Sequence, residues 1–237
     1  MSIQQMLLAG GAAGGALDPN YASVGLLLHF DGTNGGTTFT DNSPSPKTPT
    51  STNGTTTSTA TVKFGTASGS FNGSSNYLEY ADNAAWQLGT GDFTIEFWIN
   101  ASASGTYTMV VGTQQSGVDN GFWRVGNRFN SLNQIYFARG TGTGFNEVQA
   151  SVNVNDGSWH HVAVVRSSGT VTIYADGISS ASSSITGTCS TNQALRVGYN
   201  LRDSAYISGN VDDLRITKGV ARYTANFTPP TAAFPDS

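Results

Sequence analysis

Carboxylates are the first side chains to consider, because a pair of Asp or Glu residues can hydrolyse a glycosidic bond. A retaining mechanism needs two carboxyl groups about 5 Å apart. The chain has only three glutamates, Glu79, Glu96 and Glu147. The run 96–100, Glu-Phe-Trp-Ile-Asn, has one carboxylate and no second one two or four residues later. We therefore predict no catalytic residues.

Histidine and cysteine give no other reactive or metal-binding arrangement. His160 and His161 are neighbours, and neighbouring residues of a strand point to opposite faces, so they cannot form one site. We expect one to pack inside and the other to lie on the exposed face. His29 is distant in sequence, and no G-x-S-x-G motif is present. The single Cys189 excludes an intrachain disulfide and offers no metal-ligand spacing.

The elements that would position any site are strands. Residues 158–166 and 169–177 alternate apolar and polar side chains, and a Ser-Ser-Gly connection between them predicts a hairpin. In residues 93–100, Phe93, Ile95 and Phe97 share one face of a third alternating strand. No stretch has the period of a long amphipathic helix. The pattern predicts an all-β protein.

Composition and length support one domain built from many short strands. Of the 237 residues, 38% are hydrophobic, 11% are charged and 29 are Gly, and Ser, Thr and Asn are abundant. All-β sandwiches of about 200–250 residues commonly form a single domain. We predict a two-sheet antiparallel jelly-roll sandwich over residues 21–237, preceded by an extended N-terminal arm over residues 1–20.

Charge excludes one class of partner. The net charge is −4, and eleven basic residues are scattered along the chain. This distribution gives no basic stripe for a phosphate backbone, so we expect no nucleic acid.

The first twenty residues combine a short apolar start with a Gly/Ala-rich run, and no Lys or Arg precedes Lys47. A signal peptide needs a basic leading region, and a membrane-spanning helix needs about 20 apolar residues. We therefore expect neither secretion by this segment nor membrane insertion. We predict that the arm binds another protein chain by burying its apolar side chains, which are Ile3, Met6, Leu7 and Leu8.

Four segments, in this order, resemble those of laminin-G-like, concanavalin-A-like jelly rolls. They are L-L-L-H-F-D-G at 26–32, G-D-F-T-I-E-F-W-I at 91–99, the hairpin W-H-H-V-A-V…Y-x-D-G, and V-D-D-L-R-I-T-K-G at 211–219. The opening M-S-I-Q-Q-M-L-L and the closing R-I-T-K-G-V-A-R-Y-T-x-N-F-T-P-P are similar to versions in tailed-bacteriophage virion proteins. The resemblance implies a domain that mainly binds and displays.

The resemblance also implies one calcium ion between the first and last strands. Calcium takes about six to eight oxygen ligands, including carboxylates and backbone carbonyls. The matching positions are Asp31, Gly73 and Asp212. The alternative is that Asp212 pairs with Arg215 or caps a turn.

We therefore predict a bacteriophage virion structural protein on the particle surface, either a capsid decoration or a tail-fibre component. Its partners would be other virion proteins, held by the arm, host surface glycans, and further copies in a homo-oligomer. The alternatives are a free extracellular carbohydrate-binding lectin module and, less favoured, a polysaccharide-degrading enzyme. The aromatic side chains available to stack on sugars are Trp98, Trp123, Tyr136 and Tyr199; the sequence does not assign a glycan site among them.

Overall fold

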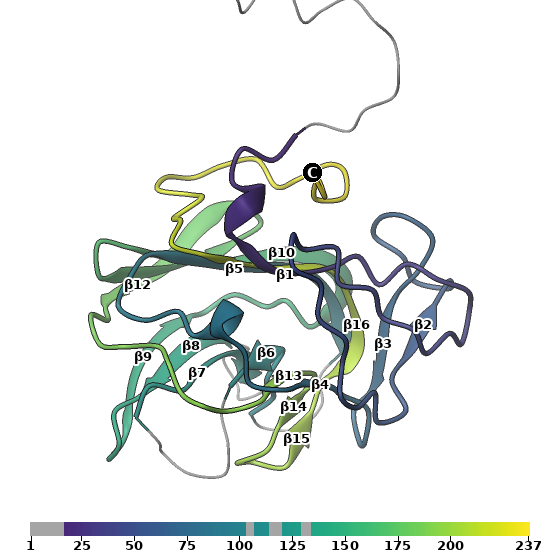
Figure 1. The fold of residues 1–237 in the computed structure, drawn as a ribbon, viewed down its shortest axis with the longest axis horizontal. Helices are drawn as coiled ribbons and strands as arrows, with labels where there is room; N and C mark the ends of the chain where they lie inside the picture. Colours follow the sequence, from purple (N-terminus) through teal and green to yellow (C-terminus); the bar gives the residue numbers. More distant parts are fainter. Residues whose placement is uncertain (1–16, 103–106, 114–119, 129–133) are drawn as a thin grey trace, which may run out of the picture.

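The fold is an all-β sandwich, as the sequence predicted. The computed structural model describes residues 17–102, 107–113, 120–128 and 134–237. In this part of the chain the strands form two antiparallel sheets that face each other (Figure 1). Helical structure in the same residues is limited to two short 3-10 turns, Tyr21–Ser23 and Ala84–Trp86. No helix among the described residues is long and apolar enough to cross a membrane.

The first sheet has the order β12-β11-β10-β5-β16-β3-β2, and β1 also pairs with β16. Its strands are β1 (Val24–Leu28), β2 (Thr56–Ser58), β3 (Ser68–Asn72), β5 (Phe93–Ser102), β10 (Asp156–Ser167), β11 (Thr170–Ala175), β12 (Ile178–Ser184) and β16 (Ser208–Lys218). The predicted hairpin is β10–β11. Its turn residues Ser168 and Gly169 have φ values of 49° and 81°, the left-handed pair that a tight two-residue hairpin turn requires.

The second sheet has the order β4-β13-β6-β7-β8-β9. Its strands are β4 (Leu78–Tyr80), β6 (Val111–Gly112), β7 (Trp123–Arg128), β8 (Gln134–Gly140), β9 (Phe145–Ala150) and β13 (Leu195–Val197). A short separate hairpin, β14 (Tyr199–Asn200) with β15 (Ala205–Tyr206), follows β13 and lies below the second sheet in Figure 1.

The hydrophobic core fills the space between the two sheets. Phe93, Ile95 and Phe97 of β5 and Trp123 and Phe137 of the second sheet are all fully buried in one cluster. The face predicted from the alternation of β5 is therefore confirmed.

Trp159, near the start of β10, is half-buried and lies outside the buried cluster. The pairing of β10 with β5 is irregular between Asp156 and Trp159. Trp159 itself pairs in register with Asn100, and alternation places it on the outer face of the sheet with Ala163 and Val165, opposite to the core residues Val162 and Val164.

The outer face of the first sheet is covered by the two ends of the chain. The tail after β16 and the segment around residues 17–23 both cross this face, on the side away from the second sheet (Figure 1). Val165 and Tyr174 pack there against Tyr223 and Phe227 of the tail. The cover occupies most of this face, and a pocket of about 330 Å³ remains within it, beside Arg215 and Phe234.

Candidate functional site

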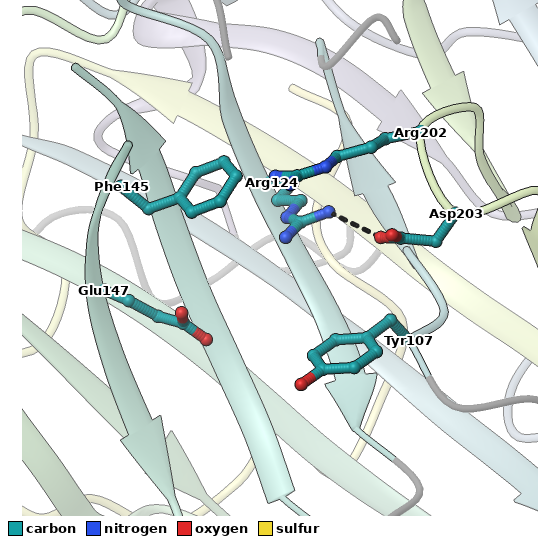
Figure 2. A pocket seen from close by; sticks show the side chains of 6 residues that line it. All are labelled: Tyr107, Arg124, Phe145, Glu147, Arg202 and Asp203. Atoms are coloured by element: carbon teal, nitrogen blue, oxygen red, sulfur yellow. Dashed lines mark hydrogen bonds and ion pairs between the residues drawn. The ribbon is translucent and has the colours of Figure 1, made fainter. Parts of the chain in front are cut away.

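A pocket opens on the outer face of the second sheet, beside the loop that joins β14 to β15. Its volume is about 290 Å³, close to the lower end of the range for small-molecule sites. Figure 2 shows its six lining side chains converging from β7, β9, the β14–β15 loop and the segment before β6. They are Tyr107, Arg124, Phe145, Glu147, Arg202 and Asp203.

Strand alternation explains why these side chains point outward. Trp123 and Val125 of β7 enter the core, so Arg124 between them faces the other way. Ala138 of β8 pairs with Arg124 on one side and with Glu147 on the other. The small methyl group of Ala138 lies between two long side chains in this row, which leaves a hollow on the sheet surface.

Arg124 forms the inner wall of the pocket. Its side chain is almost fully buried, and its Nη1 lies 3.3 Å from Oδ2 of Asp203. The guanidinium carbon lies 5.1 Å from the ring centre of Tyr136 and 5.3 Å from that of Phe145, within the range of cation–π attraction. The Nε of Arg124 is buried and has no hydrogen-bond partner. One strong donor is therefore left for a ligand.

The β14–β15 hairpin forms the opposite wall, and Asn200 holds it in place. The buried Asn200 donates from Nδ2 to the backbone carbonyl of Tyr107 at 3.0 Å and to Oδ2 of Asp203 at 2.7 Å. Tyr199 and Tyr206 stack across the hairpin with ring centres 4.3 Å apart. These contacts fix Asp203 where it meets Arg124.

The pocket combines groups that suit a hydroxyl-rich ligand. Phe145 and Tyr107 offer rings, Arg124 and Arg202 donate hydrogen bonds, and Glu147 offers an acceptor. A sugar has apolar C–H faces that pack on rings and hydroxyls that both donate and accept. The arrangement suits binding of such a molecule.

The sequence did not point to these six residues, because they come from distant segments that only the fold brings together. The four aromatic residues considered for sugar stacking are not available for it. Trp98, Trp123, Tyr136 and Tyr199 are between 0% and 9% exposed. Of the two rings that line the pocket, that of Phe145 begins β9, whose polar sequence gave no sign of a binding face.

The residues predicted for calcium have other partners. Asp212 accepts backbone hydrogen bonds from Lys63 and Phe64 at 2.9 and 3.1 Å and one from Asp213 at 2.9 Å. The ordinary pKa of an Asp side chain is 3.8. Burial raises the pKa of Asp212 to about 7, although the backbone hydrogen bonds lower it. The carboxylate oxygens of Asp212 already accept hydrogen bonds from these N–H groups. A role in capping a turn therefore fits Asp212 better than calcium binding does.

The other two predicted calcium residues do not complete a site. Asp31 accepts hydrogen bonds from the backbone and hydroxyl of Thr66, in the same loop that Asp212 binds. Among the residues that the structure describes, no group of three His, Cys, Asp or Glu side chains could hold a metal ion. The contacts do not fit calcium at this place.

Glu96, the lone carboxylate of β5, belongs to a buried ionic cluster and not to the pocket. Arg215 donates to it from Nε and Nη2 at 3.0 and 2.8 Å, and the Tyr223 hydroxyl donates to it at 2.8 Å. Arg215 and Arg222 also contact Asp18, at 3.1 and 2.7 Å. The cluster ties the chain ends to the first sheet, which is a structural role.

The three histidines also have structural settings. His29 lies 2.5 Å from Asp213, and His160 lies between Asp156 and Asp176 at 3.1 and 2.8 Å. His161 is fully buried on the opposite face of β10, as the alternation of neighbouring residues predicted.

The predicted arm is described only in part. Ile3, Met6, Leu7 and Leu8 lie outside the described residues, so their burial against another chain stays a prediction. Asp18 is described, and its pairs with Arg215 and Arg222 hold this point of the chain on the sandwich. The boundary of the arm at residue 20 also stays a prediction.

Comparison with known proteins gives the family and the fold. A family model described as the concanavalin A-like lectin/glucanases superfamily matches residues 72–222. A search of curated proteins gives no match.

Two similar solved structures are toxin domains. The binding domain of Paraclostridial mosquitocidal protein 1 has a TM-score of 0.65 and 15% identity, over 84% of this chain and 49% of that one. The binding domain of botulinum neurotoxin DC, in complex with SialylT, has a TM-score of 0.62 and 14% identity, over 84% and 49%. The chain thus spans about half the length of these domains.

A third similar structure is domain 4 of AbnA, an extracellular arabinanase from Geobacillus stearothermophilus, in complex with arabinotriose. It has a TM-score of 0.53 and 17% identity, over 70% of this chain and 76% of that one. At these identities the likeness establishes the sandwich fold alone.

Proposed function

The chain belongs to the concanavalin A-like lectin/glucanase superfamily, and we propose that it is a carbohydrate-binding jelly roll whose site is the pocket on the second sheet. One observation carries this proposal: rings, hydrogen-bond donors and acceptors converge on one hollow of about 290 Å³. Two of the similar structures were solved with a glycan bound, the neurotoxin domain with SialylT and the arabinanase domain with arabinotriose.

We further propose that this domain is displayed on a bacteriophage particle, as a capsid decoration or a tail-fibre component that touches host glycans. The support is the likeness of segments 1–8 and 215–230 to phage virion proteins, together with the apolar start of the arm. Other virion proteins would hold residues 1–16, and the chain would form a homo-oligomer. A free extracellular lectin module is the alternative, since the pocket would serve both.

An immobilised glycan array tests carbohydrate binding, with Phe145→Ala as the pocket variant. Phe64→Ala is the matched control, because Phe64 is also a half-buried phenylalanine but lies in the loop bound by Asp212, outside the pocket. We expect glycans that bind the unmodified chain to be lost with Phe145→Ala and kept with Phe64→Ala. Absence of binding to all glycans, or equal loss in both variants, would contradict the proposal.

The same experiment addresses the enzyme alternative, because two carboxylates, Glu147 and Asp203, line the pocket. Arg124 and Asn200 hold Asp203 in place, and a carboxylate held in this way suits a fixed hydrogen-bond acceptor for a bound ligand. We expect bound oligosaccharides to be recovered uncleaved. Shortened products that disappear with Glu147→Gln would instead establish a hydrolase.

Deletion of residues 1–16 tests the virion proposal. The deletion keeps Asp18 and its two arginine partners, so the sandwich should stay folded and bind glycans. We expect the shortened chain to fail to join phage particles during assembly. Incorporation of the shortened chain into particles at the normal copy number would contradict the proposal that the arm attaches the domain to the virion.

A further inference from the structure

Two arginines share one side of the pocket and pack on the same ring. The guanidinium carbon of Arg202 lies 4.5 Å from the ring centre of Phe145, and that of Arg124 lies 5.3 Å from it. Figure 2 shows the two guanidinium groups close together, above Tyr107 in this view. The negative face of the Phe145 ring attracts both guanidinium groups. The ring has no net charge, however, so it does not neutralise the two positive charges.

Two carboxylates line the same pocket, and of these Asp203 is paired with Arg124 while Glu147 comes from β9. Asp203 contacts Arg124 at 3.3 Å, which is longer than the 2.7–2.9 Å range, roughly, of strong charge-assisted bonds. The same oxygen of Asp203 also accepts from Asn200 at 2.7 Å. Arg202 is exposed and makes no hydrogen bond or ion pair with any described residue.

Arg124 adds a donor that has no other use. Its Nε is buried, lacks a partner and belongs to a side chain that is 3% exposed. A buried donor without a partner costs free energy, which a ligand acceptor at this position would recover. A carboxylate or sulfate group accepts several such bonds at once, and arginine suits planar and tetrahedral oxyanions.

We propose that the pocket selects an acidic saccharide, with a carboxylate or sulfate group placed between Arg202 and Arg124. This inference rests on the proposed carbohydrate binding and names the class of its ligand. The neutral part of the sugar lies toward Glu147 and Tyr107, on the other side of the pocket (Figure 2). The carboxylate of Glu147 there repels a second acidic group.

The test compares saccharides whose acidic group is present with matched ones in which it is masked or missing. The probes are sialyllactose against its methyl ester, a galacturonate trimer against its methyl ester, and sulfated against unsulfated lactose. We expect binding of at least one acidic member and at least tenfold weaker binding of its neutral partner. The three pairs distinguish a carboxylate from a sulfate.

Charge-removing variants locate the effect. Arg202→Gln should weaken binding of the preferred acidic probe by about ten- to a hundredfold. Lys218→Gln is the control, because it removes the same charge from another exposed residue, outside the pocket. Raising the salt from about 0.01 M to about 0.15 M, which shortens the screening length from ~30 to ~8 Å, should also weaken binding.

The outcomes separate this inference from the function on which it rests. Equal binding of acidic and neutral partners, with no effect of Arg202→Gln, overturns the acidic preference while carbohydrate binding stands. Failure of all six probes and of the glycan array overturns both.

Discussion

At the scale of single residues, Glu96 shows how a lone carboxylate becomes structural. Burial alone would raise its pKa, but the positive charge of Arg215, the contact with His161 and the positive charge of Arg222 lower it to about 2 from an ordinary 4.5. The side chain is fully buried, so its charge is stable only because these partners surround it.

Replacement of Glu96 by Gln should destabilise the fold by about 3–5 kcal/mol, because it leaves buried Arg215 without its main counter-charge. Urea denaturation measures the free energy of unfolding. Glu79→Gln is the control. The Glu79 side chain is 28% exposed in its pair with Arg196, so water compensates and the loss should be smaller. Equal losses in the free energy of unfolding for the two variants would show that the buried cluster stabilises the fold no more than the exposed pair does.

Asp212 yields a second prediction at this scale. Its carboxylate accepts three backbone N–H groups, which leaves calcium no fitting position. The melting temperature should therefore be the same in EDTA and in excess calcium, as measured by circular dichroism. A fall in EDTA that disappears with Asp212→Asn would restore the calcium prediction.

At the scale of elements, the C-terminal tail acts as part of the first sheet's packing. Phe234 donates its N–H to Asp213 at 2.7 Å, and its ring lies 3.8 Å from the guanidinium carbon of Arg215. Tyr223 and Phe227 stack 3.6 Å apart over the same face. The tail thus covers the ionic cluster and keeps water from it.

Truncation after Lys218 should therefore lower stability strongly, because it removes Arg222 and Tyr223 from Glu96 and exposes Val165. Truncation after Asp236, which keeps these contacts, is the control. Differential scanning calorimetry should show a much lower melting temperature for the first truncation only. Similar melting temperatures would mean that the tail is dispensable.

The sequence allowed the sandwich to be predicted because alternation records which side of a strand is buried. Phe93, Ile95 and Phe97 show this clearly, and all three lie in the core. The pocket could not be predicted in the same way. Arg124 and Phe145 meet only through sheet pairing and the β14–β15 hairpin, contacts between segments distant in the sequence.

At the scale of the whole molecule, the ionisable groups predict a stability maximum in mildly acidic solution. Glu96 has a lowered pKa, so its contribution is present above pH 4.5 and is lost as the pH falls toward 2. Asp212 has a raised pKa of about 7, so its contribution is present below its ordinary 3.8 and is lost as the pH rises through 7.

Two histidines act in the same direction as Asp212. Burial would lower the pKa of His29 and of His160, but hydrogen bonds to Asp213 and to Asp176 outweigh it and raise both values. Their contributions are present at low pH and are lost as the pH rises. The melting temperature should be higher at about pH 5 than at about pH 8. A higher value at pH 8 would contradict these assignments.

The central claim is that a glycan binds in the pocket on the second sheet, and a crystal structure with the tightest-binding array glycan tests it most directly. The account predicts sugar density against Phe145, with polar groups in hydrogen-bond contact with Arg124 and Arg202. Sugar density at any other surface, with this pocket holding only solvent, would contradict it.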